Sequence, residues 1–286
     1  MAKRTWSAQR AFRTAPGYKA RPTKAGYHCR QGLLGDIIAD RPVTGCAATP
    51  WLLRSCIQYT REELVVRLSE SDRHMPGHAA LVVVDVQNDF CSPQGSLPAG
   101  YGFDLQFIDA MVPRLQRLIE AARGAGIPVV FVRTVHDPSN DSPAWLGRLG
   151  DGDGTERTGV TCRTGSWGAE FFGVAPAFGD HVIIKNRFSA FVGTNLSLTL
   201  RSLGVGSVLF AGVATEVCVE SSLRDGLFHD FYVTLVQDCA ASYSQAAHDA
   251  SVRVVGKHFG LVTTADELVS RWTPARRAEE VGVGSQ

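Results

Sequence analysis

The sequence contains no apolar run that approaches the roughly 20 residues of a membrane-spanning helix, and no hydrophobic stretch after Met1 of the kind found in secretory signal peptides. Its seven cysteines include no CxxC pair, which argues against a zinc ribbon or a disulfide framework. No GxGxxG or phosphate-binding loop follows the first predicted strand, which disfavours a dinucleotide enzyme. From these absences we expect a cytoplasmic protein that does not bind a membrane.

Acidic residues are missing from the first 32 positions, which carry eight Lys and Arg side chains. Over residues 1–74 the basic residues outnumber the acidic ones by 13 to 6, whereas over residues 75–286 the acidic residues lead by 22 to 16. The net charge of +1 therefore combines a basic segment with an acidic body. Clustered positive charge suits phosphate contacts, and an Arg-rich, acid-poor segment is also typical of targeting peptides.

Residues 1–50 show no sustained helical or strand period. We interpret residues 1–74 as a basic, poorly ordered N-terminal extension, and one version of this interpretation is a translation start at Met75. A nucleic-acid-binding arm and a targeting peptide are the alternatives. Residues 75–286 are then a single domain of ordinary size, and its net negative charge argues against nucleic acid as its own partner.

The body alternates apolar strand-like runs with helix-like stretches. The predicted strands are Ala79–Val84, Ile127–Arg133, His181–Lys185, Ser207–Ala211, Phe231–Val236 and Phe259–Val262. The predicted helices are Leu105–Arg123, Thr194–Leu203, Glu216–Phe228, Gln245–Val255 and Ala265–Trp272. This alternation predicts an α/β fold of three layers, a Rossmann-like arrangement in which helices flank a six-stranded parallel sheet.

Three reactive side chains follow three of these strands. Asp85 follows the first strand, Lys185 ends the third, and Cys218 lies in AGVATEVCVESS, where a loop becomes a helix. The carboxyl ends of parallel strands meet at one edge of a sheet, so we expect the three to converge. Cys218 would attack a carbonyl carbon as a thiolate, Asp85 would carry its proton, and Lys185 would hold both by charge. Backbone N–H groups at Ala214 and Cys218 would stabilise the oxyanion.

Each of these residues also has a structural interpretation. A lone Cys at such a junction is usually a small buried residue, and an Asp that ends a strand often forms a turn or a helix cap. A Lys at a strand end is usually solvated. Their joint placement, rather than any one of them, favours hydrolysis of an amide-like C–N bond through an acyl-enzyme.

Three motifs occur in the order LVVVDVQNDFCSPQGSLPAG, KNRFSAFVGTNL and GVATEVCVESSLRDG. Together they resemble the isochorismatase-like cysteine hydrolases, over about residues 79–272. The resemblance implies a Cys–Asp–Lys triad with Cys218 as nucleophile, Asp85 as general acid/base and Lys185 as third member. It also implies a cis peptide bond between Val213 and Ala214.

The presence of Cys218 favours the amidohydrolase branch of this family, which includes ureidoacrylate amidohydrolases, N-carbamoylsarcosine amidases, and biuret and streptothricin hydrolases. Nicotinamidases, the alternative within the family, carry a metal site of one Asp and two His after the second strand. Here Val135, Asp137 and Asp141 fall where those ligands would lie. The resemblance therefore implies a hydrolase with no metal and no other cofactor, which cleaves a ureido, carbamoyl or lactam substrate.

Residues near the predicted strand ends are candidates for the substrate pocket. We predict that substrate contacts come from Asp89, Phe90, His136, Trp145, Trp167, Phe188, Phe191 and Glu216. The loops within residues 141–172 suit a lid over a small polar substrate. Cys162 lies in such a loop without a strand–helix elbow, so we do not predict it as a nucleophile.

The expected partners are a small-molecule substrate and, by resemblance, further copies of the chain in a homo-oligomer. The alternative from another functional class is a non-catalytic nucleic-acid-binding protein that uses the basic N-terminus.

Overall fold

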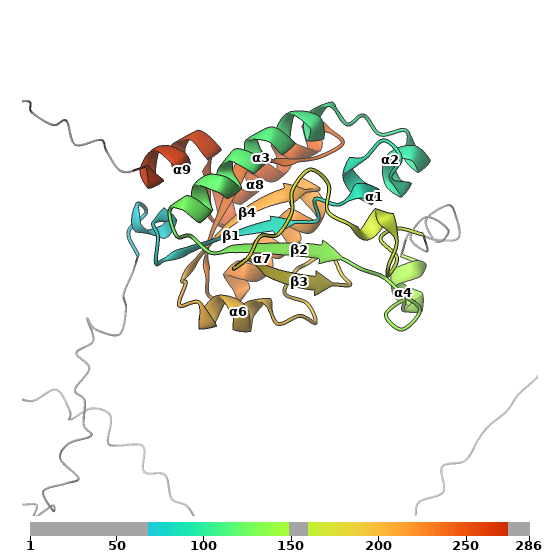
Figure 1. Ribbon diagram of the computed structural model, residues 1–286, viewed down its shortest axis with the longest axis horizontal. Coiled ribbons are helices and arrows are strands. Elements are labelled where there is room, and N and C mark those ends of the chain that lie inside the picture. The colour runs from blue at the N-terminus through green and yellow to red at the C-terminus, as the bar shows by residue number, and fades with distance from the viewer. Residues whose placement is uncertain (1–67, 149–159, 274–286) are drawn as a thin grey trace, which may run out of the picture. The chain divides into compact units, whose positions relative to one another are not determined.

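The computed structural model describes residues 68–148 and 160–273, which belong to one compact unit (Figure 1). The predicted N-terminal extension lies outside the described residues except for residues 68–74, and part of the predicted lid, residues 149–159, also lies outside them. The interpretation of residues 1–74 therefore stays a prediction. Within the described part of the chain, no helix is long and apolar enough to cross a membrane.

One sheet of six parallel strands forms the middle layer, which confirms the predicted fold class. Its strands are β1 (Ala79–Val84), β2 (Val129–Thr134), β3 (His181–Lys185), β4 (Ser207–Val213), β5 (Tyr232–Ala241) and β6 (Leu261–Thr263). They lie in the order β3-β2-β1-β4-β5-β6, and every neighbouring pair is parallel. The order reverses at β1, so the chain places β2 and β4 on either side of it.

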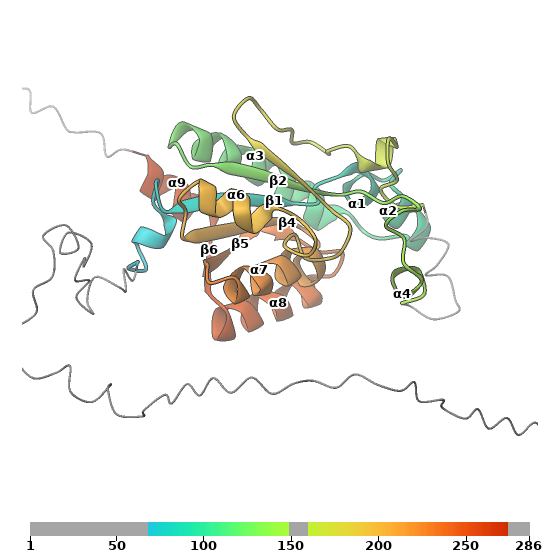
Figure 2. The ribbon, with the colours of Figure 1, turned by 90° about the horizontal axis from the view of Figure 1, so that it is seen from below.

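Helices cover both faces of the sheet (Figure 2). Helices α3 (Gln106–Gly124) and α9 (Ala265–Trp272) pack on one face, and α6 (Leu196–Ser202), α7 (Glu220–Phe228) and α8 (Gln245–His258) pack on the other. Shorter helical segments are η2 (Asp72–His74), α1 (Asn88–Cys91), α2 (Ser96–Tyr101), α4 (Pro143–Leu146), η3 (Trp167–Ala169) and the π-helical turn η4 (Thr215–Val219).

The central strand shows why the sequence folds into three layers. All six residues of β1 are buried, with Leu81 and Val83 in one hydrophobic cluster and Val82 and Val84 in the other. Successive strand side chains point to opposite faces, so a continuous apolar run needs helices on both sides.

The end of β4 comes unusually close to β1. Gly212 has a φ of 116°, and a Cβ at this position would lie 2.0 Å from the carbonyl oxygen of Val84. Only glycine fits such a contact in that conformation. The close approach brings the turn after β4 next to Asp85, the residue that follows β1.

The described body begins before Met75. His74 is buried, its Nε2 lies 3.0 Å from Oγ1 of Thr234, and its carbonyl oxygen accepts a 2.7 Å hydrogen bond from Nε1 of Trp272. His74 therefore packs with β5 and α9, although the sequence analysis placed it in the extension.

Candidate active site

Asp85, Lys185 and Cys218 converge at the carboxyl edge of the sheet. Asp85 directly follows β1, Lys185 is the last residue of β3, and Cys218 lies in the π-helical turn after β4. All three side chains are buried. The long side chain of Lys185 reaches back from the edge strand β3, so residues from three different strands come into contact.

A buried ion pair forms the centre of this group. Nζ of Lys185 lies 2.7 Å from Oδ2 of Asp85, and both side chains are 1% exposed. Oγ1 of Thr134, at the end of β2, donates to Oδ1 of Asp85 at 3.1 Å and accepts from Nζ of Lys185 at 2.7 Å. Asp85 has a φ of 53°, a left-handed conformation that Asp adopts more readily than most residues. The hydrogen bonds of β1, β2 and β3 thus hold the carboxylate and the ammonium in one position.

Cys218 contacts this pair through its sulfur, which accepts a 3.5 Å hydrogen bond from Nζ of Lys185. Burial raises the pKa of the Cys218 thiol, and the charge of Asp85 raises it further. The charge of Lys185 lowers this pKa, but the net shift is upward. Burial by itself would lower the pKa of Lys185, but Asp85 and Cys218 raise it above the ordinary value. Both shifts favour the protonated forms, a thiol on Cys218 and an ammonium on Lys185.

Side chains from other elements hold the turn that carries Cys218. Oγ of Ser222 donates to the carbonyl oxygen of Cys218 at 2.7 Å. Oγ1 of Thr215 lies 2.9 Å from Nδ1 of His248, and Oγ of Ser242 donates to Oε1 of Glu216 at 2.8 Å. The peptide bond between Val213 and Ala214 is cis, as the resemblance implies. Side chains from α7, from α8 and from the residue after β5 therefore hold the turn.

A cavity of about 300 Å³ opens beside these three residues. Its walls combine aromatic rings with a few charged groups, a composition typical of small-molecule sites. The described lining residues are Asp85, Phe90, Leu97, Tyr101, Phe103, Thr134, His136, Trp145, Arg148, Thr161, Lys185, Arg187, Phe188, Val213, Ala214, Glu216, Val217, Cys218 and Tyr243. Of the eight residues predicted as substrate contacts, five line it: Phe90, His136, Trp145, Phe188 and Glu216.

Three predicted contacts lie elsewhere. The carboxylate of Asp89 accepts hydrogen bonds from the backbone N–H groups of Ser96 at 2.8 Å and Cys162 at 2.6 Å, so it links α1 to α2 and to the loop that carries Cys162. The side chain of Trp167 is half exposed, and Phe191 is buried in the core beneath α6, where its ring lies 4.9 Å from that of His229. None of the three is among the residues that line the cavity.

Sequence reasoning missed several wall residues, notably the aromatic ones before α3 and after β5. Tyr101, Phe103 and Tyr243 stack in series, with ring centroids 5.1 Å and 4.3 Å apart. Arg187 follows Lys185 by two residues and could have been found from that spacing. Thr134 is the last residue of β2, and the others come from short helices and loops, which carry no periodic signal in the sequence.

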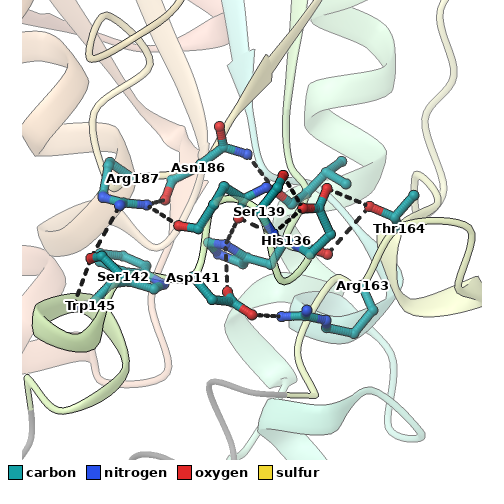
Figure 3. Close-up of polar contacts among 12 residues, drawn as sticks. His136, Ser139, Asp141, Ser142, Trp145, Arg163, Thr164, Asn186 and Arg187 are labelled. Carbon is teal, nitrogen blue, oxygen red and sulfur yellow. Dashed lines mark hydrogen bonds and ion pairs between the residues drawn. The ribbon is translucent and has the colours of Figure 1, made fainter.

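The loop after β2 holds Val135, Asp137 and Asp141, the residues that the resemblance aligns with the metal ligands of nicotinamidases. Figure 3 shows Asp141 and its polar neighbours. Val135 offers no ligand atom. The Asp137 side chain accepts from Ser139, and Asp141 pairs with Arg163 at 2.8 Å. Nδ1 of His136 lies 3.3 Å from Oδ1 of Asn140, and burial lowers the pKa of His136.

These donors do not fit a metal site, because Arg163 already pairs with Asp141, whose Oδ1 lies 4.0 Å from Nδ1 of His136. Within the described residues, no three His, Cys, Asp or Glu side chains gather in a way that could hold a metal ion.

The family model described as the isochorismatase domain matches residues 79–267. The ureidoacrylate amidohydrolase of Variovorax paradoxus is 34% identical over 210 residues, which cover 69% of this chain and 82% of that protein.

Solved structures share the fold. A cysteine hydrolase from Pseudomonas syringae pv. phaseolicola matches with a TM-score of 0.60 at 26% identity, over 69% of this chain and 93% of that one. The N-carbamoylsarcosine amidase of Thermoplasma acidophilum matches with a TM-score of 0.53 at 28% identity, over 66% and 97%. The pyrazinamidase of Pyrococcus horikoshii, solved in complex with zinc, matches with a TM-score of 0.54 at 29% identity, over 65% and 99%.

Proposed function

Since the chain belongs to the isochorismatase family, we propose that it hydrolyses an amide-type C–N bond of a small molecule, with Cys218 as nucleophile and without a metal ion. The observation that carries this proposal is the contact of the Cys218 sulfur with the buried Asp85–Lys185 pair at the wall of the cavity. The similarity to a ureidoacrylate amidohydrolase and to an N-carbamoylsarcosine amidase supports a ureido or carbamoyl substrate. A lactam is the third substrate class of the proposal, and it rests on the sequence motifs alone.

In the first half of the reaction, Asp85 removes the proton from the Cys218 thiol as the sulfur attacks the carbonyl carbon. The carbonyl oxygen becomes an oxyanion that accepts hydrogen bonds from the backbone N–H groups of Ala214 and Cys218. The C–N bond then breaks, and Asp85 returns its proton to the leaving nitrogen. This leaves an acyl group on the sulfur as a thioester.

In the second half, a water molecule replaces the amine. Asp85 takes a proton from this water, and the resulting hydroxide attacks the thioester carbon. The C–S bond breaks, the acid or carbamic acid leaves, and the sulfur recovers its proton from Asp85. Lys185 stays protonated throughout, because its contacts with Asp85 and Cys218 raise its pKa. Its charge stabilises the thiolate at the moment when it forms.

The test compares two cysteines of the same chain. We expect Cys218→Ala and Cys218→Ser to lower kcat by at least about a thousandfold, since nucleophile and base act as a unit. Cys162→Ser is the matched control, because Cys162 is also buried but its sulfur donates to the Gly168 carbonyl oxygen, 3.7 Å away. The screen includes ureidoacrylate, N-carbamoyl amino acids, biuret, streptothricin lactam and nicotinamide. Full turnover of an active substrate by Cys218→Ala would refute the assignment.

A metal-dependent nicotinamidase is the second candidate, because the zinc-bound pyrazinamidase is 29% identical. Elemental analysis of the purified protein, together with a nicotinamide assay, separates the two. Stoichiometric zinc or iron with nicotinamide turnover that a chelator abolishes would overturn the metal-independent proposal.

Cytoplasmic location and homo-oligomeric assembly are part of the same proposal. Light scattering at micromolar concentration measures the assembly directly, and a monomer would contradict it.

A further inference from the structure

The cavity wall contains a buried carboxylate oxygen for which the protein supplies no hydrogen-bond donor. Glu216 lines the cavity, and its Oε1 accepts a 2.8 Å hydrogen bond from Oγ of Ser242. Its Oε2 is buried and accepts no hydrogen bond. A buried acceptor without a partner costs free energy, so its presence beside a cavity indicates a donor that arrives with a water molecule or a ligand.

Two other carboxylates of the described residues also have a buried oxygen without a hydrogen-bond donor, Oδ2 of Asp85 and Oδ1 of Asp141. Each of these carboxylates pairs with a cation, Asp85 with Lys185 and Asp141 with Arg163. Glu216 takes part in none of the ion pairs between described residues. Of the three carboxylates, it is therefore the one whose charge has no counter-ion.

Polar side chains near the turn that carries Glu216 are already engaged with other partners. The hydroxyl of Tyr243 donates to the carbonyl oxygen of Phe90 at 2.8 Å. Oγ1 of Thr215 lies 2.9 Å from Nδ1 of His248, and burial lowers the pKa of His248, which favours its neutral form. These residues therefore provide neither the missing donor nor a counter-ion.

Glu216 and the ion pair lie on different sides of the nucleophile. In the strand order β3-β2-β1-β4-β5-β6, Asp85 and Lys185 follow β1 and β3, on one side of the turn after β4. Ser242, the partner of Glu216, follows β5, on the other side of that turn. A substrate whose scissile bond lies against Cys218 and the ion pair would therefore meet Glu216 with a more distant group.

The arginines of the cavity gather at another wall. The guanidinium groups of Arg148 and Arg187 lie 4.2 Å and 5.1 Å from the ring centroid of Trp145. Nη2 of Arg187 also donates to Oγ of Ser142 at 3.4 Å (Figure 3). Trp145 belongs to α4, which follows β2, and Arg187 follows β3. The cavity is thus polarised, with the carboxylate of Glu216 toward β5 and the guanidinium groups toward β3.

We propose that Glu216 binds a protonated amine of the substrate, placed away from the bond that is cleaved. A carboxylate accepts its strongest hydrogen bonds from charged N–H groups, and a partly desolvated wall strengthens them. Substrates of this enzyme are then small ureido, carbamoyl or lactam compounds that carry an ammonium group. The kinetic part of this inference rests on the proposed function, whereas the binding of an ammonium group does not.

The kinetic test compares N-(2-aminoethyl)urea with propylurea, which share the ureido group and differ only in an ammonium or a methyl group at the far end. Chromatography of the amine product measures cleavage. We expect the wild-type protein to prefer the ammonium compound. Glu216→Gln should lower the ammonium-to-methyl ratio of kcat/KM about 10- to 100-fold, mainly through KM, because a charge-assisted hydrogen bond is lost.

The same variant makes a second, opposite prediction. The amide of Glu216→Gln keeps an oxygen for Ser242 but presents an N–H donor in place of Oε2. It also removes the negative charge that would repel a carboxylate. The ratio of kcat/KM for 3-ureidopropionate to that for propylurea should therefore rise in this variant, and a fall would contradict the assigned role of Oε2.

Glu220→Gln is the matched control, because Glu220 lies one helical turn later, pairs with Arg224 and is not among the described residues that line the cavity. Its ratios should equal those of the wild type. An equal loss of both activities in Glu216→Gln would assign Glu216 a purely structural role. Unchanged kinetics in that variant would mean that Oε2 binds only water. Either result, or a wild-type preference for propylurea, would overturn the proposal.

A binding test needs no turnover. Propylammonium chloride should raise the Tm of the wild-type protein relative to sodium chloride at equal ionic strength, and this difference should shrink in Glu216→Gln but not in Glu220→Gln. If Glu216→Gln does not fold, the wild-type comparison with propan-1-ol and the Glu216→Asp variant decide. The same difference in the wild type and Glu216→Gln would overturn the ammonium site. A propylammonium effect without hydrolysis of any substrate would instead refute the proposed function alone.

Discussion

The buried pair of Lys185 and Asp85 makes a prediction in which stability and catalysis separate. Lys185→Met keeps most of the side-chain volume but leaves the Asp85 carboxylate buried without its cation. Breaking a buried pair from one side costs about 3–5 kcal/mol. For a domain of this size about 1 kcal/mol shifts the Tm by about 2–4 °C, so Tm should fall by roughly 6–20 °C.

The double variant Asp85→Asn with Lys185→Met removes both charges. Thr134 can still donate to the amide oxygen of the new Asn, so no buried charge is left unpaired. We expect the double variant to regain most of the lost stability, to within about 1–2 kcal/mol of the wild type. Asp85→Asn removes the group that carries the proton, and Lys185→Met removes the charge that stabilises the thiolate. Turnover should therefore be absent in both single variants and in the double variant.

Urea unfolding at pH 7 measures the free energy of unfolding of the wild type, of the two single variants and of the double variant. The Cys218-dependent hydrolysis measures their activity. A double-mutant cycle on Arg123 and Asp180 is the control, because the arginine of this ion pair is 32% exposed. Its coupling energy should be only about 0–1 kcal/mol. A Lys185→Met variant as stable as the wild type would refute the reasoning. So would a double variant whose loss equals the sum of the two single losses, or one that retains turnover.

Two further predictions concern residues outside the triad. Gly168→Ala should lower the free energy of unfolding in urea by about 1–3 kcal/mol, because its Cβ would lie 2.0 Å from Oδ2 of Asp89. Gly124→Ala is the control and should be near neutral, because the space around Gly124 is open. Burial, followed by the charge of Arg271, lowers the pKa of His74 from 6.5, so the unfolded state binds the proton first as pH falls. Stability should therefore be full above about pH 6.5 and decline below it. Denaturation curves between pH 5 and 7.5 should show that His74→Gln flattens this decline. An unchanged dependence of stability on pH in this variant would contradict the assignment.

The strands were predictable because each is a short apolar run between turn residues. The predicted limits of Ala79–Val84 and His181–Lys185 match β1 and β3. The observed β5 extends five residues beyond the predicted Val236, past a register shift opposite Phe210 and Gly212. A bulge of this kind depends on pairing with a neighbouring strand, so local apolar patterning carries no sign of it.

The cavity wall was less predictable than the three converging residues. Asp89 lies four residues after Asp85, but its carboxylate is already used by the backbone N–H groups of Ser96 and Cys162. Tyr243, by contrast, lies on a loop after β5, and its hydroxyl donates to the Phe90 carbonyl oxygen at 2.8 Å. Distance along the chain from the predicted nucleophile or base does not identify wall residues of this kind.

The sequence by itself determined the fold class and the strand ends that carry Asp85, Lys185 and Cys218, because both follow from the alternation of apolar strands and helices. Only the tertiary structure decided the strand order, the contacts among these three groups and the environment of Glu216. Those features depend on which surfaces meet across the sheet and on which buried charges find a counter-ion, and no local pattern of residues specifies either.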